Sequence, residues 1–201
     1  MKAVVFDFDG VIHDTFDFHL KNVRQVFGEH IPEQDFRDIH NGSFFQNPTN
    51  ALRNADWEAY RKHVHRNMSN LVMQESTRNF LLDLAKRYEL FIISSGSTAI
   101  ITDYLNNNRI YSAFTEILGL DGHGSKVEKF ERVFRDHDLR ADLCVFVTDT
   151  LGDIMEAREV GVRTIAIDTG YHDRDTLLKG SPHHIISRLE ELHQVLESPD
   201  R

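Results

Sequence analysis

The sequence predicts an α/β fold: a doubly wound parallel sheet with an α-helical unit inserted after its first strand. Short apolar runs rich in Val, Ile and Phe recur along the chain, and such runs are typical of strands covered on both faces. Segments with helical periodicity separate these runs, which is the pattern of βαβ units. One separation breaks the rhythm, because the chain between the first two runs is much longer than one crossover helix needs.

The strands are expected at four strong runs and two weaker ones: Ala3–Phe6, Leu90–Ile93, Leu143–Val147 and Thr164–Ile167, then Phe114–Leu118 and His184–Ile186. The helices between them are expected at Thr77–Tyr88, Thr98–Asn107, Val127–His137, Ile154–Val160 and Ser187–Leu196. From residue 76 onward, strands and helices alternate regularly. We therefore assign residues 1–13 and 76–201 to an α/β core.

Residues 14–75 are expected to form the inserted unit. Helical periodicity is visible at Phe16–Phe27 and again at Asp56–Val72. Between these helices, the segment His40–Pro48 combines turn-forming residues with two adjacent aromatic residues. The insertion is therefore predicted to be a small helical unit that carries a central loop.

Composition limits the class of partner. The net charge of −9 offers no general attraction for nucleic acid or for an anionic membrane. The chain has no run of about 18 apolar residues, and its first apolar stretch is too short for a signal peptide. Cys144 is the single cysteine, so a disulfide framework is excluded and a reducing compartment fits. We expect a soluble cytoplasmic protein with a small-molecule partner, and the oligomeric state is not indicated.

The first expected strand ends at a pair of carboxylates, Asp7 and Asp9, and Gly10 then allows a sharp turn. Two carboxylates at this spacing can divide the work of phosphoryl transfer. One can attack phosphorus, while the other handles the proton of the leaving group. An Asp-x-Asp-Gly segment on its own is more often a polar turn, so the interpretation depends on what lies beside it.

A second acidic pair follows another expected strand. Asp149 comes one residue after Val145–Val147, and Asp153 lies where a helix begins. The helix dipole alone could explain Asp153. Asp149 is better explained as a ligand, because Mg²⁺ prefers oxygen ligands and needs only one or two carboxylates beside substrate phosphate. Since strand carboxyl ends meet at one sheet edge, Asp7 and Asp149 are expected to lie together.

Two further segments can bind the phosphoryl group. Ser94, Ser95 and Gly96 follow the expected strand at Leu90–Ile93, where a hydroxyl and backbone amides can form an anion site. An ordinary helix start explains these residues equally well. Lys126 lies at the start of the next helix and can pair with phosphate and a nearby carboxylate, although most lysines are solvated.

These four segments, in this order and at these strand ends, resemble the motifs of the haloacid dehalogenase-like hydrolase superfamily. Asp7-Phe8-Asp9-Gly10-Val11 is similar to the first motif of that superfamily, and Ser94 and Lys126 to the second and third. Asp149 with Asp153 is similar to the fourth. The resemblance covers nearly the whole chain. It implies a Rossmann-like core, with the insertion at 14–75 as a small helical cap.

The resemblance also implies roles. Asp7 would be the nucleophile and a Mg²⁺ ligand, while Asp9 would be the general acid and base and would offer its backbone carbonyl to the metal. Ser94, Ser95 and Gly96 would hold phosphoryl oxygens. Lys126 would neutralise the phosphoryl group and orient Asp7, and Asp149 and Asp153 would bind or support the metal. Thr148 departs from the family pattern, which usually has glycine there, and is expected to crowd or hydrogen-bond the metal ligands.

The resemblance favours a Mg²⁺-dependent phosphatase that acts on a small phosphorylated metabolite through an aspartyl-phosphate. Asp9 favours this activity over dehalogenation, because a halide leaves without a proton whereas an alkoxide needs one. Two alternatives remain open. One is a phosphomutase of the β-phosphoglucomutase type, and the other is a non-catalytic module that binds phosphate.

Substrate choice is expected to depend on the inserted unit. The loop residues His40, Asn41, Gly42 and Phe44 are the candidate specificity residues, although Phe44 could equally belong to the core of the cap. The dense basic run at residues 61–66 could attract an anionic substrate. Helical spacing divides this run over several faces, so a solvated surface is the preferred interpretation.

Overall fold

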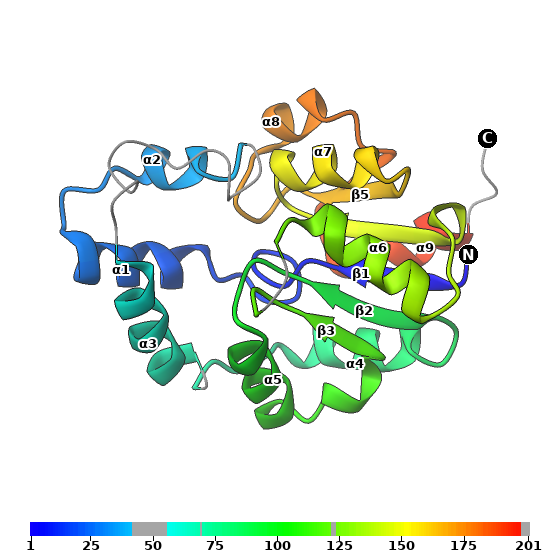
Figure 1. The fold of residues 1–201 in the computed structure, drawn as a ribbon, viewed down its shortest axis with the longest axis horizontal. Coiled ribbons are helices and arrows are strands. Elements are labelled where there is room, and N and C mark those ends of the chain that lie inside the picture. Colours follow the sequence, from blue (N-terminus) through cyan, green and yellow to red (C-terminus); the bar gives the residue numbers. More distant parts are fainter. Residues whose placement is uncertain (42–55, 69, 122–123, 198–201) are drawn as a thin grey trace.

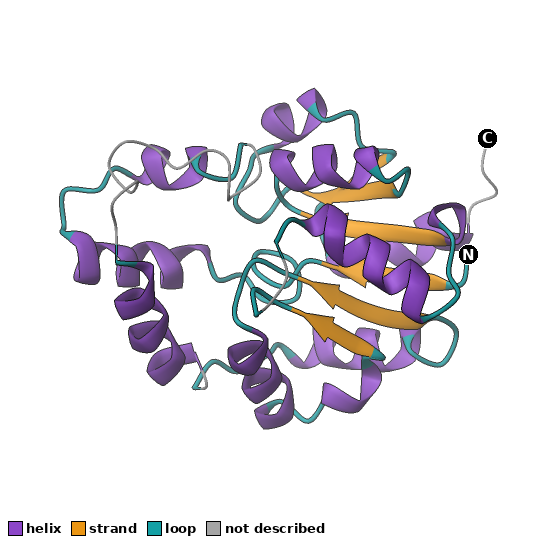
Figure 2. Ribbon diagram, in the orientation of Figure 1, coloured by secondary structure: helices purple, strands orange, loops and turns teal. Residues whose placement is uncertain are grey.

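A six-stranded, fully parallel sheet forms the centre of the molecule, and its strand order is β3-β2-β1-β4-β5-β6 (Figure 2). The computed structural model describes residues 1–41, 56–68, 70–121 and 124–197. The strands are β1 Ala3–Phe6, β2 Glu89–Ile93, β3 Glu116–Leu118, β4 Cys144–Thr148, β5 Arg163–Ile167 and β6 His184–Ile186. The predicted α/β fold with a doubly wound parallel sheet is confirmed.

Helices cover both faces of this sheet (Figure 1). They are α4 Glu75–Leu84, α5 Thr98–Asn107, α6 Lys126–Asp136, α7 Leu151–Glu159, α8 Arg174–Lys179 and α9 Leu192–Glu197. Alternate residues of β1 belong to two apolar clusters on opposite faces of the sheet. Val4 and Phe6 belong to a cluster with residues of α4 and α5, whereas Ala3 and Val5 belong to a cluster with residues of α6 and α7. Burial on both faces explains why the strands are continuous apolar runs.

The register brings three strand ends together. Phe6, the last residue of β1, pairs with Ile92 of β2 on one side and with Val147 of β4 on the other. From β1, the strands follow one another outward as β2 and β3 on one side and as β4, β5 and β6 on the other. The carboxyl edge beside β1 is therefore the switch point of the sheet. The residues that directly follow β1, β2 and β4 therefore lie near one another.

Three helices from the segment between β1 and α4 extend beyond this edge of the sheet (Figure 1). They are α1 Phe16–Phe27, α2 Glu33–Asp38 and α3 Trp57–Met68. Aromatic rings join α1 to α3: the ring centroid of Phe27 lies 5.3 Å from that of Trp57 and 5.9 Å from that of Tyr60. None of the described helices is long and apolar enough to cross a membrane.

Several element boundaries differ from those predicted. β3 begins at Glu116, because residues 111–113 form a 3₁₀ turn and Phe114 packs edge-on against Phe6. α7 begins earlier than predicted, since Thr150 caps it by accepting a hydrogen bond from the Asp153 amide at 3.3 Å. The last helix is shorter than predicted and follows a 3₁₀ turn. Two six-residue helices, α2 and α8, were not predicted because each is too short to show a helical period.

Candidate active site

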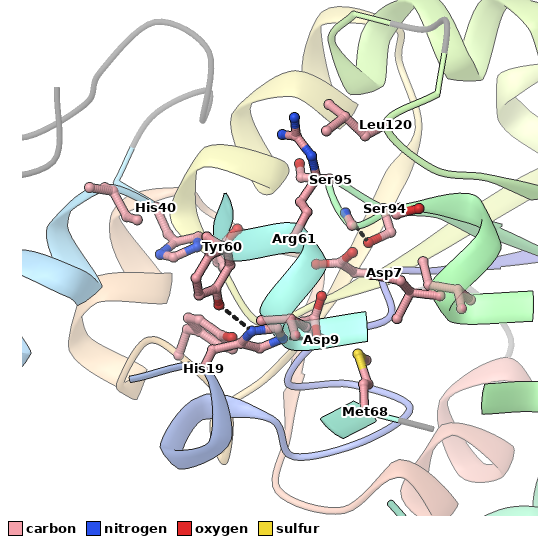
Figure 3. Close-up of a pocket in the computed structure, with 18 of the residues that line it drawn as sticks. Asp7, Asp9, His19, His40, Tyr60, Arg61, Met68, Ser94, Ser95 and Leu120 are labelled. Atoms are coloured by element: carbon pink, nitrogen blue, oxygen red, sulfur yellow. Dashed lines mark hydrogen bonds and ion pairs between the residues drawn. The ribbon is translucent and has the colours of Figure 1, made fainter. Parts of the chain in front are cut away.

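A cavity of about 150 Å³ lies between the carboxyl edge of the sheet and the helices α1 and α3 (Figure 3). The core contributes the residues that follow three strands, together with the first residue of α6. Every predicted catalytic or metal-binding side chain lines this cavity: Asp7, Asp9, Ser94, Lys126, Asp149 and Asp153. Residues from four separate parts of the sequence thus surround one small volume.

Asp7 lies at the floor of the cavity, directly after β1. Its backbone amide continues the sheet by donating to the Val147 carbonyl at 2.9 Å. Its side-chain Oδ1 accepts from the Phe8 amide at 2.8 Å and lies 2.9 Å from Lys126 Nζ. Burial raises the pKa of Asp7 to about 7 against the opposing effect of the lysine. The carboxylate is therefore oriented from the backbone and stabilised by one adjacent positive charge.

Lys126 is the first residue of α6, and its side chain is only 3 % exposed. Its ammonium lies between two carboxylates, 2.9 Å from Asp7 Oδ1 and 2.5 Å from Asp153 Oδ2. Burial opposes the charged form, but Asp153 and Asp7 raise the pKa of Lys126 above its usual value. The lysine is therefore a permanent positive charge within the cavity. Its interpretation as a solvated surface residue is excluded.

Asp149 is fully buried after β4, and its two oxygens differ. Oδ2 accepts from the Tyr171 amide at 2.7 Å, whereas Oδ1 is buried and has no hydrogen-bond partner among the described residues. Burial, followed by the nearby Asp7 charge, raises the pKa of Asp149 well above its usual value. A buried carboxylate oxygen without a partner is costly unless a cation or a proton satisfies it.

This donor set fits a hard divalent cation. The charge of Asp7 raises the pKa of Asp149, so a positive charge near both carboxylates would relieve repulsion. The described residues contain no ready cluster of three or more acidic, histidine or cysteine side chains in metal-binding geometry. Lys126 already engages Asp153, and Thr148 also donates to Asp153 Oδ2 at 2.6 Å. Thr148 therefore hydrogen-bonds a predicted ligand, which is one of its two expected effects.

Glycine is required where the backbone passes Asp149. Gly10 has a φ of +72°, and a Cβ atom added there would lie 1.9 Å from Asp149 Oδ2. We expect Gly10→Ala to displace Asp149 and to lower the free energy of unfolding. Gly161→Ala is a matched control, because Gly161 has a φ of +75° but its added Cβ would meet only Ala141 at 3.9 Å.

Both substitutions carry the backbone strain of a positive φ, but only Gly10→Ala adds a steric overlap. In urea titrations, Gly10→Ala should therefore cost roughly 1–3 kcal/mol more than Gly161→Ala. Equal losses for the two variants would show that the contact with Asp149 does not require glycine.

Asp9 has partners on the inserted helices. Its Oδ1 accepts from Thr15 Oγ1 at 2.7 Å and lies 2.9 Å from His19 Nε2. The other ring nitrogen of His19 lies 2.6 Å from the Tyr60 hydroxyl on α3 (Figure 3). Although burial would raise the pKa of Asp9, His19 lowers it below its usual value. Asp9 is therefore ionised in this state, and its orientation depends on α1 and α3.

The segment after β2 is also stabilised by hydrogen bonds. Ser94 Oγ accepts from the Gly96 amide at 2.9 Å, and the Ser94 carbonyl accepts from Lys129 Nζ at 2.7 Å. Lys129 is 0 % exposed, and burial, followed by the nearby charge of Lys126, lowers its pKa to about 8. Ser94, Ser95 and Gly96 all line the cavity. A second ammonium thus lies behind the predicted phosphoryl-binding segment.

Sequence reasoning missed Thr15, His19, Tyr60 and Lys129. A signal existed for three of these residues. Thr15 and His19 are four residues apart at the start of a predicted helix, so they share one face, and Lys129 follows Lys126 by three residues on another helix. For Tyr60, no local pattern separates a residue that contacts the site from an ordinary core aromatic.

The predicted specificity residues have different positions. His40 lines the cavity, and burial lowers its pKa to about 4. Asn41 does not line the cavity, and its side chain donates to Asp38 Oδ1 at 2.9 Å. Gly42 and Phe44 lie outside the described residues. The specificity loop as a whole stays a prediction.

Comparison with known proteins gives related sequences and folds. A phosphoglycolate phosphatase from Synechococcus elongatus is 24 % identical over 210 residues, which cover 98 % of this chain and 97 % of that protein. A solved haloacid dehalogenase-like family hydrolase from Streptococcus pneumoniae has a TM-score of 0.81 at 20 % identity, covering 98 % and 99 % of the two chains. A candidate β-phosphoglucomutase from Thermotoga maritima has a TM-score of 0.70 at 20 % identity over similar fractions, 98 % and 99 %.

The sequence also matches a family model. Residues 4–167 match the model described as haloacid dehalogenase-like hydrolase, a range that begins within β1 and ends with β5. It therefore includes all four motif segments and the inserted helices. The chain belongs to the haloacid dehalogenase-like hydrolase family, as a member of its phosphatase type.

Proposed function

We propose that this protein is a Mg²⁺-dependent phosphatase that hydrolyses a small phosphate monoester through an aspartyl-phosphate on Asp7. One observation carries the proposal. The Asp7 carboxylate lies 2.9 Å from the buried Lys126 ammonium, and both line one cavity with Asp149, whose Oδ1 has no partner among the described residues. A nucleophile, a cation for the transferred group and an unsatisfied metal ligand are thus adjacent.

Mg²⁺ would be held by Asp7, Asp149, Asp153 and the backbone carbonyl of Asp9. When bound, the metal supplies positive charge that relieves carboxylate repulsion and polarises a phosphoryl oxygen. Phosphoryl transfer depends mainly on positioning and on stabilisation of charge. The lysine ammonium and the segment Ser94–Gly96 supply the rest of that stabilisation.

In the first step, an oxygen of Asp7 attacks phosphorus and the bond to the ester oxygen breaks. The departing alkoxide takes a proton from Asp9, whose carboxylate is ionised in the substrate-free structure and must gain this proton before the step. In the second step, Asp9 accepts a proton from water, which attacks phosphorus and releases Asp7 and inorganic phosphate. His19 Nε2, 2.9 Å from Asp9 Oδ1, orients the carboxyl group for these transfers.

Residues 14–75 would act as a cap over the core formed by residues 1–13 and 76–201. The contacts of His19 with Asp9 and with Tyr60 link α1 and α3 to the acid–base residue. Closure of such a cap would exclude water from the first step and orient Asp9. The related phosphoglycolate phosphatase makes phosphoglycolate the first substrate to assay.

Release of inorganic phosphate from a panel of phosphate monoesters tests the proposal. Phosphatase activity predicts release that is stoichiometric with ester cleavage. An isomeric sugar phosphate formed without free phosphate would instead identify a phosphomutase. Binding of phosphate esters without turnover would identify a non-catalytic module.

Removal of divalent metal should abolish turnover. Treatment with a chelator is expected to reduce the rate at least about 100-fold, because the metal contributes several kcal/mol of charge stabilisation, and added Mg²⁺ should restore it. Circular dichroism under the same conditions checks that the fold survives. Full turnover in the chelated, folded protein would refute the metal requirement.

A further inference from the structure

Above the floor of the cavity, the walls contributed by the inserted helices are mostly apolar. α3 contributes one face, on which Tyr60, Val64 and Met68 are at most 9 % exposed. Residues at this spacing share a helix face, so the side chains of that face point into the cavity together. The described residues of the insertion at 14–75 that line the cavity are His19, Phe36, Ile39, His40, Trp57, Tyr60, Arg61, Val64 and Met68. This set contains no acidic side chain.

Arg61 is the only lysine or arginine in that set. In Figure 3 its side chain extends from α3 toward Ser95 and Leu120, which line the core side of the same cavity. Within the described part of the chain, Arg61 forms no hydrogen bond and no ion pair. The neighbouring Glu58 is engaged by Lys62, whose Nζ lies 2.7 Å from Glu58 Oε1.

The other basic side chains that the structure describes in this run do not line the cavity. His63 Nε2 lies 3.1 Å from Gln25 Oε1, and His65 Nε2 lies 3.0 Å from Asp103 Oδ2. Neither histidine lines the cavity, and Lys62 does not line it either. The expectation of a solvated surface therefore fits Lys62, whereas Arg61 is exposed and also lines the cavity. Helical spacing separates this one guanidinium from the neighbouring charges, which do not line the cavity where the structure describes them.

We propose that Arg61 binds a second anionic group of the substrate, so that the substrate is a small phosphate monoester with a carboxylate or another phosphate at its far end. This inference rests on the proposed function. The guanidinium fork matches either anion with two parallel hydrogen bonds. The transferred phosphoryl group already has Lys126 and Ser94–Gly96 at the floor, so it does not need Arg61. The apolar walls offer few partners to a substrate rich in hydroxyl groups.

Paired substrates that differ only at the far end test the inference. At the far end, phosphoglycolate carries a carboxylate and ethylene glycol bisphosphate carries a second phosphate. The control, 2-hydroxyethyl phosphate, carries an uncharged hydroxyl group there. In the wild-type protein, kcat/KM should favour an anionic member over the neutral one. Arg61→Met should lower kcat/KM for that anionic substrate about 10- to 100-fold, mainly through KM, and should leave the neutral ester within about twofold. The anionic substrate with the larger loss identifies the group that Arg61 binds.

Two variants sharpen the comparison. Arg61→Lys keeps the charge but loses the fork, so it should retain part of the preference for the anionic substrate. Lys62→Met removes the adjacent charge outside the cavity and should leave all three kcat/KM values unchanged. If Arg61→Met lowers the three values equally, or if the wild-type protein does not prefer an anionic ester, the inference is overturned while the phosphatase proposal stands.

A binding measurement keeps the inference testable without turnover. Isothermal titration calorimetry with 3-phosphonopropionate and with propylphosphonate, which lacks the carboxylate at the far end, needs no catalysis. Wild-type protein should bind 3-phosphonopropionate at least about 10-fold more tightly than Arg61→Met does. The two proteins should bind propylphosphonate equally. Equal affinities of the two proteins for the carboxylated phosphonate would overturn the inference. Absence of turnover of every ester with Mg²⁺ would overturn only the proposed function.

Discussion

Asp7→Asn should abolish phosphate ester hydrolysis, with kcat reduced by about 10⁶, the scale observed when a catalytic nucleophile is removed. The amide is a poor nucleophile and cannot form the acyl phosphate. Its Oδ1 can still accept hydrogen bonds from the Phe8 amide and from Lys126, so the geometry around β1 should persist. Steady-state assays with Mg²⁺ measure the loss.

The phosphoenzyme provides a second readout for Asp7. Wild-type protein that is quenched with acid during turnover of the ester should carry one phosphoryl group that hydroxylamine removes. Peptide mass spectrometry should place this group on Asp7. Asp7→Asn should carry none while showing an unchanged thermal unfolding midpoint within a few degrees, because the substitution keeps shape and hydrogen bonds. Full activity in this variant would refute the assignment of the nucleophile.

Asp9→Asn is expected to reduce kcat by about 10²–10⁴, the usual contribution of general acid–base catalysis. Asparagine Oδ1 can still accept from Thr15 and interact with His19, so proton transfer is lost while the main contacts remain. The reduction should depend on the leaving group. An alkyl phosphate, whose alkoxide needs the proton, should lose more activity than p-nitrophenyl phosphate, whose phenolate leaves readily.

The ratio of these two losses separates chemistry from structure. A structural disturbance at Asp9 would slow both substrates equally, whereas loss of the acid should make the alkyl ester disproportionately slow. Thr15→Val offers a matched control, because it removes a hydrogen bond to Asp9 but leaves the titratable carboxyl group. Its effect should be similar for the two substrates. Equal losses in Asp9→Asn would show that Asp9 does not protonate the leaving group.

The residues after the central strands could be placed from the sequence. Asp7, Ser94 and Asp149 each follow a continuous apolar run, and such runs indicate parallel strands buried on both faces. In a parallel sheet all carboxyl ends lie at one edge, so a one-dimensional pattern is sufficient to predict a shared site. The weak strand at Glu116–Leu118 and the short helices were less predictable, because three to six residues hardly define a period.

Local sequence thus determined the α/β fold, the edge of the sheet where the site lies and the carboxylates at that edge, since strand burial follows from the order of apolar residues. Only the tertiary structure decided that Lys129 lies behind Ser94, that His19 and Tyr60 reach Asp9, and that Arg61 rather than Lys62 enters the cavity. These contacts join segments far apart in the chain. They depend on how each helix is rotated and docked against the core, which packing of the whole molecule establishes and no local period encodes.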